Sequence, residues 1–189
     1  MHHFALIVGL CWIVFIVVWF VSAFGAKRNL STPWWRSGWL RIIIAFVIYA
    51  IFHQEIHTAF FASHELPLVN PIISAIGALL AIIGIALAIW ARLYIGSNWG
   101  MPMTLKENRE LVTSGPYKYI RHPIYTGVML TMIGTVLALG LLWLLLPFAI
   151  YSLYFIYSAT SEEKTLAEEL PNEYPAYKKR TKMLIPFIF

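Results

Sequence analysis

Long uncharged apolar stretches alternate with short polar segments along the chain, and their lengths predict membrane-spanning helices. Apolar residues dominate 4–24, 42–61 and 71–94, and a helix needs about 20 such residues to cross a hydrocarbon core about 30 Å thick. A fourth stretch, 123–161, contains no charged residue. Because one helix of that length would measure roughly 60 Å at about 1.5 Å per residue, we expect a hairpin of two shorter helices that turns near Gly140.

The segment after this hairpin is polar and predicts a further short helix. In SEEKTLAEEL, residues 161–170, Leu166 and Leu170 are spaced i, i+4 and Pro171 follows directly, which is typical of an amphipathic helix that ends at proline. Within the hairpin, we expect Pro147 to be tolerated through contacts with neighbouring helices. The pattern predicts an all-α integral membrane protein with about five transmembrane helices, a hairpin of spans four and five, and a short cytoplasmic carboxyl-terminal helix.

Composition agrees with a membrane protein and excludes several other classes. The chain is 60% hydrophobic and 12% charged, with a mean hydropathy of +0.71. Its net charge of +5 does not indicate nucleic-acid binding, because the basic residues are scattered among loops. The single cysteine, Cys11, lies in the first apolar stretch, so no intrachain disulfide or thiolate metal cluster forms. All nine acidic residues are glutamates, which excludes paired-aspartate magnesium motifs.

Charges in the loops predict the orientation in the membrane. The segment 25–41 carries four cations and three tryptophans, and the segment 92–121 is again basic, whereas 63–70 has no lysine or arginine. Basic loops face the cytoplasm and tryptophans favour the membrane interface. We therefore expect a multi-pass protein with its amino terminus outside, and with the loop 92–121 and the carboxyl terminus in the cytoplasm.

The polar chemistry concentrates in GPYKYIRHPIYTG, residues 115–127. His122 and Pro123 are expected to open the fourth helix, because proline suits a first helical turn and the free backbone N–H groups there attract anions. The preceding Gly-Pro pair predicts a turn that folds Tyr117 and Tyr119 over the helix end. Flat aromatic walls of this kind suit a purine ring or a sulfonium cation.

Glu162 and Glu163 follow the hairpin, which returns the chain to the side of the motif. Two carboxylates there would match the ammonium group of a small zwitterionic ligand. An equally good interpretation is that the arginine and tyrosines of the motif only anchor the protein at the membrane interface. The residues alone leave both interpretations open.

Three runs resemble a known family. LVTSGPYKYIRHPIYTG at 111–127, followed by EEKTLAEELPNEYPAYKKR at 162–180 and the closing LIPFIF, resembles the isoprenylcysteine carboxyl methyltransferase and phospholipid methyltransferase family. The resemblance implies a membrane-embedded, S-adenosylmethionine-dependent methyltransferase whose cofactor pocket is closed by the tail. It divides the single membrane domain, 1–189, into a three-span part at 1–97 and a methyltransferase-like part at 98–189.

The resemblance also implies the roles of individual residues. Arg121 would orient the cofactor carboxylate or a substrate anion. Independently of the resemblance, an amine acceptor must lose a proton, which Glu163 or a water that it orients would take, so Arg121 and Glu163 are the candidate catalytic residues. Glu162 would hold the amino group of the cofactor. The candidate cofactor-binding residues are Arg109, Glu110, Leu111, Val112, Tyr117, His122, Pro123, Ile124, Tyr125 and Glu162.

The methyl acceptor is expected to be a lipidic or prenylated molecule that enters from the bilayer beside spans four and five, in the manner of an isoprenylcysteine carboxylate. Family members that act on this carboxylate resemble one another in having an arginine four residues before the first glutamate, but here that position is Ser158. Arg92 or Arg121 would have to replace it. Amine N-methylation of a phospholipid is therefore the alternative reaction.

Two further function classes stay open at this point. NADPH-dependent sterol reductases resemble the carboxyl-terminal half in their arginine-histidine pair and tyrosine-rich basic tail. A metal-binding protein would use the intramembrane pair His53 and His57, although packed histidines are the simpler interpretation. In the tail, Lys178 and Lys179 are expected to be attracted to anionic lipid headgroups, and no nucleic-acid partner is expected.

Overall fold

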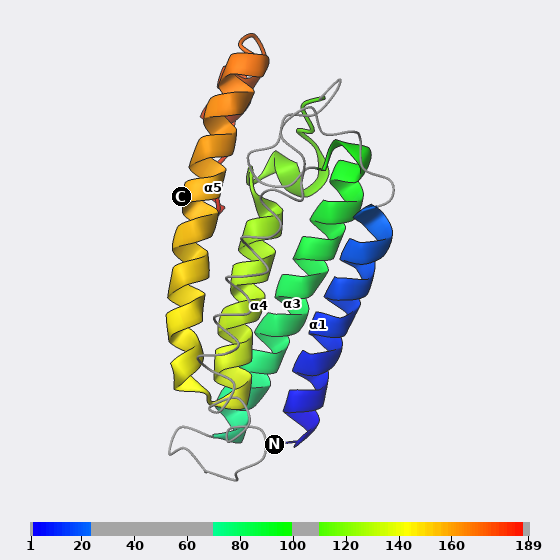
Figure 1. Cartoon of the computed structure of the whole chain (residues 1–189), viewed down its shortest axis with the longest axis vertical. Coiled ribbons are helices and arrows are strands. Elements are labelled where there is room, and N and C mark those ends of the chain that lie inside the picture. The colour runs from blue at the N-terminus through cyan, green and yellow to red at the C-terminus, as the bar shows by residue number, and fades with distance from the viewer. Residues whose placement is uncertain (1, 24–69, 100–109, 187–189) are drawn as a thin grey trace, which may run out of the picture.

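The structure is a computed structural model that describes residues 2–23, 70–99 and 110–186. Every regular element in these ranges is helical (Figure 1). The helices are α1 (His2–Ala23), α3 (Pro71–Ile95), α4 (Pro123–Leu139), α5 (Leu145–Glu169) and the short α6 (Tyr174–Arg180). Short 3-10 turns at Gly96–Asn98, Gly115–Lys118 and Leu142–Leu144 connect them.

The long helices match the spans predicted from the sequence. Segments His2–Ser22, Pro71–Asn98 and Leu142–Glu169 are long and apolar enough to cross a membrane, and Pro123–Leu139 is a shorter apolar helix. The described part is therefore that of a helical integral membrane protein. The predicted second span, 42–61, lies outside the described residues, so the total of five spans stays a prediction.

The hairpin between α4 and α5 turns at Gly140, as predicted. Gly140 has φ 67°, and its N–H donates to the carbonyl of Val136, so it closes α4 in the left-handed conformation that glycine adopts at helix ends. Pro147 lies in the first turn of α5 rather than in its interior. The expectation that neighbouring helices compensate for it was therefore wrong, because a first turn has no hydrogen bond for proline to remove.

The polar segment 161–170 does not form a separate helix, in contrast to the prediction. It continues α5 without a break to Glu169, because its residues are good helix formers and no glycine or proline interrupts them. Its apolar positions do pack as expected, since Leu166 is buried against the tail with Leu170 beside it. The helix ends just before Pro171.

Helices α3 and α4 are antiparallel and touch through their backbones. A Cβ atom added at Gly84 would lie 2.5 Å from the carbonyl oxygen of Gly127, and one added at Gly134 would lie 2.5 Å from the backbone N of Ala81. Small residues permit this close approach, which provides van der Waals packing where the hydrophobic effect between helices is absent. Helix α1 joins the pair through the buried Val8.

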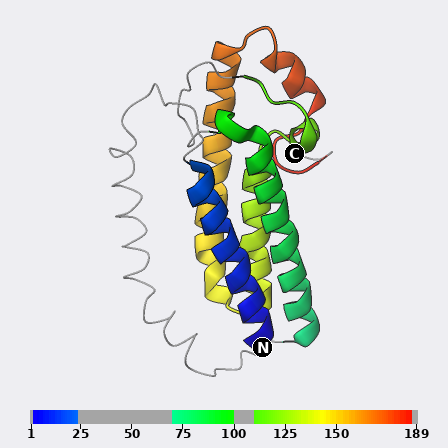
Figure 2. The same cartoon turned by 90° about the vertical axis from the view of Figure 1, so that its right-hand side faces the viewer.

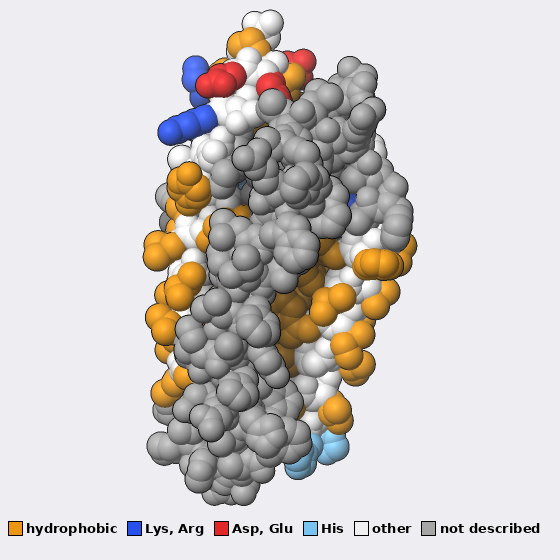
Figure 3. All heavy atoms as spheres, viewed as in Figure 1, with side chains coloured by type: hydrophobic (Ala, Val, Ile, Leu, Met, Phe, Trp, Pro, Cys, Tyr) orange, Lys and Arg blue, Asp and Glu red, His pale blue; other side chains and the backbone are white. Residues whose placement is uncertain are grey.

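One end of this bundle carries the polar segments. The carboxyl ends of α1, α3 and α5 and the amino end of α4 gather there, and Figure 2 shows α6 at the same end. Apolar side chains cover the flanks, while charged ones appear at this end in Figure 3. Helix α5 packs less closely than α3, as its large apolar residues such as Leu146, Ile150 and Leu153 are exposed. The fold thus places the motif beside the end of a loosely packed helix.

Replacing Gly84 or Gly127 by alanine is expected to destabilise the protein by about 1–3 kcal/mol, because the added methyl group would overlap the facing backbone. Thermal unfolding of the detergent-purified protein measures the change. Gly9→Ala is the matched control: nothing lies within 4 Å of its added Cβ atom, so it should leave stability unchanged or raise it slightly. Equal stability of all three variants would contradict the close helix contact.

Candidate active site

The motif forms the start of α4 as the sequence predicted. His122 is the N-cap residue and Pro123, which is fully buried, occupies the first helical turn. The preceding turn begins at Gly115, which has φ 58° and lies against the ring of Tyr94. A side chain at this glycine would overlap that ring as well as strain the backbone. Sequence and packing therefore fix where the helix begins.

The carboxyl-terminal tail runs alongside the motif and satisfies its backbone groups. The N–H of Arg121 donates to the carbonyl of Lys182 at 2.8 Å, and the N–H of His122 donates to that of Met183 at 3.1 Å. The hydroxyl of Thr126 donates to the carbonyl of Leu184 at 2.7 Å. These bonds fix the tail against the helix start.

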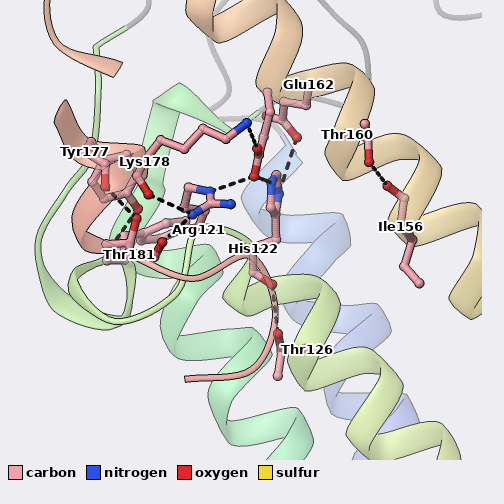
Figure 4. Close-up of polar contacts among 11 residues, drawn as sticks. Arg121, His122, Thr126, Ile156, Thr160, Glu162, Tyr177, Lys178 and Thr181 are labelled. Atoms are coloured by element: carbon pink, nitrogen blue, oxygen red, sulfur yellow. Dashed lines mark hydrogen bonds and ion pairs between the residues drawn. The ribbon is translucent and has the colours of Figure 1, made fainter. Parts of the chain in front are cut away.

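Glu163 is the centre of an ion-pair cluster at this junction (Figure 4). Its Oε1 accepts from Arg121 Nε at 2.6 Å, and its Oε2 lies 2.7 Å from Lys178 Nζ. The carboxylate is only 3% exposed. Arg121 also donates to the carbonyls of Thr181 and Lys178. Both oxygens of Glu163 are thus occupied by cations.

Glu162 has a different environment one residue earlier. Its side chain is 22% exposed, and its Oε2 lies 3.9 Å from His122 Nδ1. Behind it, the rings of His122 and Tyr125 stack at 5.3 Å, and those of Tyr125 and Phe155 stack at 5.0 Å. The arrangement presents a partly open carboxylate beside an aromatic column that leads toward the apolar part of the bundle.

The two tyrosines predicted as pocket walls are not equivalent. Tyr117 is 6% exposed and donates its hydroxyl hydrogen to the carbonyl of Ala91, while its own carbonyl accepts from Tyr177 at 2.7 Å. Burial raises the pKa of Tyr117 well above its usual range and that of Tyr177 to about 12, so both phenols remain donors at neutral pH. Tyr119 is 54% exposed, and its role as a wall stays a prediction.

The structure brings five of the predicted residues together: Arg121, His122, Tyr125, Glu162 and Glu163. The remaining predicted residues are more scattered. Arg109 lies outside the described residues, Glu110 is exposed, Val112 and Ile124 are half-buried, and Leu111 packs on the tail cluster of Leu166, Tyr174 and Tyr177. Their cofactor contacts stay predictions.

Sequence reasoning missed two contributors to this site. Lys178 was expected to face lipid headgroups, but it pairs with Glu163. Phe155 was not singled out, although it precedes Glu162 by seven residues and therefore lies on the same face of α5. The helical spacing of Phe155 from Glu162 could have indicated its position. The partner of Lys178 could not be predicted in this way, because it depends on the path of the tail.

Arg92, the suggested replacement for a carboxylate-binding arginine, already binds other groups of the protein. It is 1% exposed, donates to the carbonyls of Ser22 and Gly96, and lies over the ring of Trp99. These contacts tie the carboxyl ends of α1 and α3 together. The contacts with the helix ends are therefore sufficient to explain why a buried arginine stands at this position.

Two buried polar atoms near the site make no hydrogen bond, Ser158 Oγ and Tyr174 Oη, and His122 Nε2 has only a long contact of 3.5 Å to Glu163 Oε1. Buried polar groups are normally paired, so this concentration fits a place where a polar ligand completes the structure. Across the ranges 2–23, 70–99 and 110–186, no group of side chains is suited to hold a metal ion. The pair His53 and His57 lies outside those ranges.

Comparison with known proteins identifies the family. The model described as phospholipid methyltransferase matches residues 72–173, more than half of the chain. The chain belongs to this family. That match includes the motif, the glutamate pair and the hairpin between them.

Three relatives illustrate the similarity. Protein-S-isoprenylcysteine O-methyltransferase of Schizosaccharomyces pombe is 32% identical over 102 residues, which cover 52% of this chain and 43% of the relative. Cobalt-zinc-cadmium resistance protein CzcN of Cupriavidus metallidurans is 28% identical over 156 residues, 80% of this chain and 63% of the relative. Methanethiol S-methyltransferase 1 of Bradyrhizobium diazoefficiens is 36% identical over 72 residues, 38% and 24% of the two chains. The chain spans less than half the length of the isoprenylcysteine methyltransferases it matches.

Tyr177→Phe is expected to cost about 1–3 kcal/mol of stability, because it leaves the buried carbonyl of Tyr117 without its donor. Since the folded pKa of Tyr177 is raised from 10.0 to about 12, this contribution is complete below pH 10 and is lost as the pH rises through 12. Unfolding midpoints of both proteins from pH 7 to 12 measure it. Tyr157→Phe, on the exposed side of α5, is the control, and an unchanged Tyr177→Phe midpoint at pH 7 would contradict the prediction.

Proposed function

We propose that the protein is an S-adenosylmethionine-dependent methyltransferase that acts on a lipidic acceptor. The observation that carries the proposal is the partly exposed carboxylate of Glu162 at the His122–Pro123 helix start, in a chain of the phospholipid methyltransferase family. Both features occur at the polar end of an apolar bundle. A water-soluble donor and a bilayer-soluble acceptor can meet at such an end.

The donor would be held by this chain's own groups. Glu162 would accept hydrogen bonds from the amino group of S-adenosylmethionine, and the free N–H groups of the first α4 turn would attract its carboxylate. His122 and Tyr125 would border it, and Arg121 would add positive charge nearby. The bound donor supplies an electrophilic methyl group on a sulfonium. The protein's task is then to exclude water and align the acceptor with that methyl group.

The acceptor would approach from the membrane between α4 and α5. The aromatic column of Tyr125 and Phe155 continues to Tyr151, whose ring centroid lies 6.3 Å from that of Phe155. These rings offer an apolar surface from the middle of α5 to Glu162. The orientation expected from the basic loops places the site and the carboxyl terminus on the cytoplasmic side of the membrane.

The family resemblance and the isoprenylcysteine methyltransferase relatives favour a prenylcysteine-like carboxylate as the acceptor. Ser158 favours a second candidate. It is wholly buried one helical turn before Glu162 and its hydroxyl makes no hydrogen bond. Within the described ranges, Arg92 and Arg121 are already engaged. An amine or thiol acceptor, which needs no cation, is therefore the alternative.

Binding of S-adenosylhomocysteine by calorimetry tests the donor site. Wild-type protein is expected to bind it, and Glu162→Gln is expected to bind about tenfold or more weakly, because a charge-assisted hydrogen bond contributes about 1.5–3 kcal/mol. Glu168→Gln, on an exposed turn of the same helix, is the control and should bind like wild type. Thermal protection by NADPH but not by S-adenosylhomocysteine would favour a reductase and contradict the proposal.

Methyl transfer from a labelled donor tests the acceptor. The wild-type protein is offered a farnesylcysteine carboxylate, phosphatidylethanolamine and a small alkyl thiol. If Ser158 disfavours carboxylates, Ser158→Arg should raise turnover of the farnesylcysteine relative to the other two, whereas Ser158→Ala should not. Efficient carboxylate methylation by wild type, unaffected by either change, would contradict a role for this position.

A further inference from the structure

Glu163 connects three parts of the chain that are far apart in sequence. Arg121 comes from the motif, Lys178 from α6, and the carboxylate itself from α5. Arg121 Nε reaches the carboxylate at 2.6 Å and Lys178 Nζ reaches it at 2.7 Å. A carboxylate with both oxygens engaged in this way has little capacity to take a proton from a substrate. Its geometry fits an anchor.

The side chain of Arg121 depends on the tail as much as on Glu163. Its Nη1 donates to the carbonyls of Lys178 and Thr181, while its Nε donates to Glu163. Its backbone N–H, and that of His122, donate to tail carbonyls as well. If the tail moved away, Arg121 would lose three acceptors at once, the carbonyls of Lys178, Thr181 and Lys182. The position of the donor-binding end of α4 is thus coupled to the tail.

The tail has a second attachment that does not involve charge. Tyr177 donates to the carbonyl of Tyr117, and Tyr174 and Tyr177 pack on Leu166. Removing the Lys178 ammonium should therefore loosen the tail without unfolding α6. Because Lys178 is 53% exposed and Glu163 only 3%, its contribution is modest, whereas loss of the Glu163 charge would leave Arg121 buried without its partner.

We propose that Glu163 and Lys178 are positioning residues: their ion pair clamps the tail, residues 174–184, onto the start of α4 and thereby holds Arg121 and His122 in the geometry that binds the methyl donor. This inference rests on the proposed function for its effect on the donor. The contact between tail and motif is independent of that function. The clamp therefore acts on donor affinity, not on the methyl-transfer step.

The test compares Lys178→Met and Glu163→Gln with wild type in the full-length detergent-purified protein. We expect S-adenosylhomocysteine to bind about three- to fivefold more weakly to Lys178→Met, in line with a partly exposed ion pair of up to about 1 kcal/mol. Glu163→Gln should bind at least about tenfold more weakly. In both variants the KM for the donor rises by a similar factor, and kcat at saturating donor stays within about twofold.

Two controls separate the clamp from general effects. Lys178→Arg should restore wild-type affinity, since it keeps the cation, and Lys179→Met, at the exposed neighbouring position, should have none of these effects. Limited proteolysis reports on the tail without any ligand: cleavage within 174–184 should accelerate in Lys178→Met and not in Lys179→Met. This readout also remains available if Glu163→Gln fails to fold.

The outcomes distinguish the clamp from the proposed function. A large fall in kcat of Glu163→Gln with unchanged donor affinity would assign Glu163 to the chemistry and overturn the clamp. A Lys178→Met protein with wild-type affinity and wild-type cleavage would also overturn the clamp. If wild type binds no S-adenosylhomocysteine while Lys178→Met still loosens the tail, the proposed function fails and the clamp's structural half is supported.

Discussion

The backbone contact between Gly84 of α3 and Gly127 of α4 determines much of what surrounds the site. Gly127 is the fifth residue of α4, so the contact lies within the first turns after His122 and Pro123. Helices that touch through their backbones have little freedom to slide, because every displacement brings carbonyl oxygens into overlap. The motif therefore starts from a rigid base although it lies at the end of a helix.

The other side of the site has a different physical origin. Helix α5 has large exposed apolar residues along most of its length, and its buried residues, from Ser158 to Leu166, lie toward its polar end. There Phe155 stacks on Tyr125, and Glu163 meets the motif and the tail. Among the described residues, the site therefore has one closely packed wall, the α3–α4 pair, and a second wall, α5, whose large apolar side chains are mostly exposed.

Two adjacent glutamates acquire different properties from their surroundings. Glu163 lies inside the bundle end and is neutralised by Arg121 and Lys178, whereas Glu162 keeps part of its surface open beside His122. Successive residues on a helix are about 100° apart, so Glu163 faces the tail and Glu162 faces the ring of His122. Two side chains with the same chemistry thus have different environments, one buried between two cations and one partly exposed.

The sequence by itself determined the apolar helices, the hairpin turn at Gly140 and the helix start at His122 and Pro123, because length, glycine conformation and proline geometry act locally. It also indicated the glutamate pair and the family. Only the tertiary structure decided that Tyr119 faces outward and that Lys178 binds Glu163. Those outcomes depend on the path of a tail that meets the motif some 60 residues away in the sequence, and no local pattern encodes such a contact.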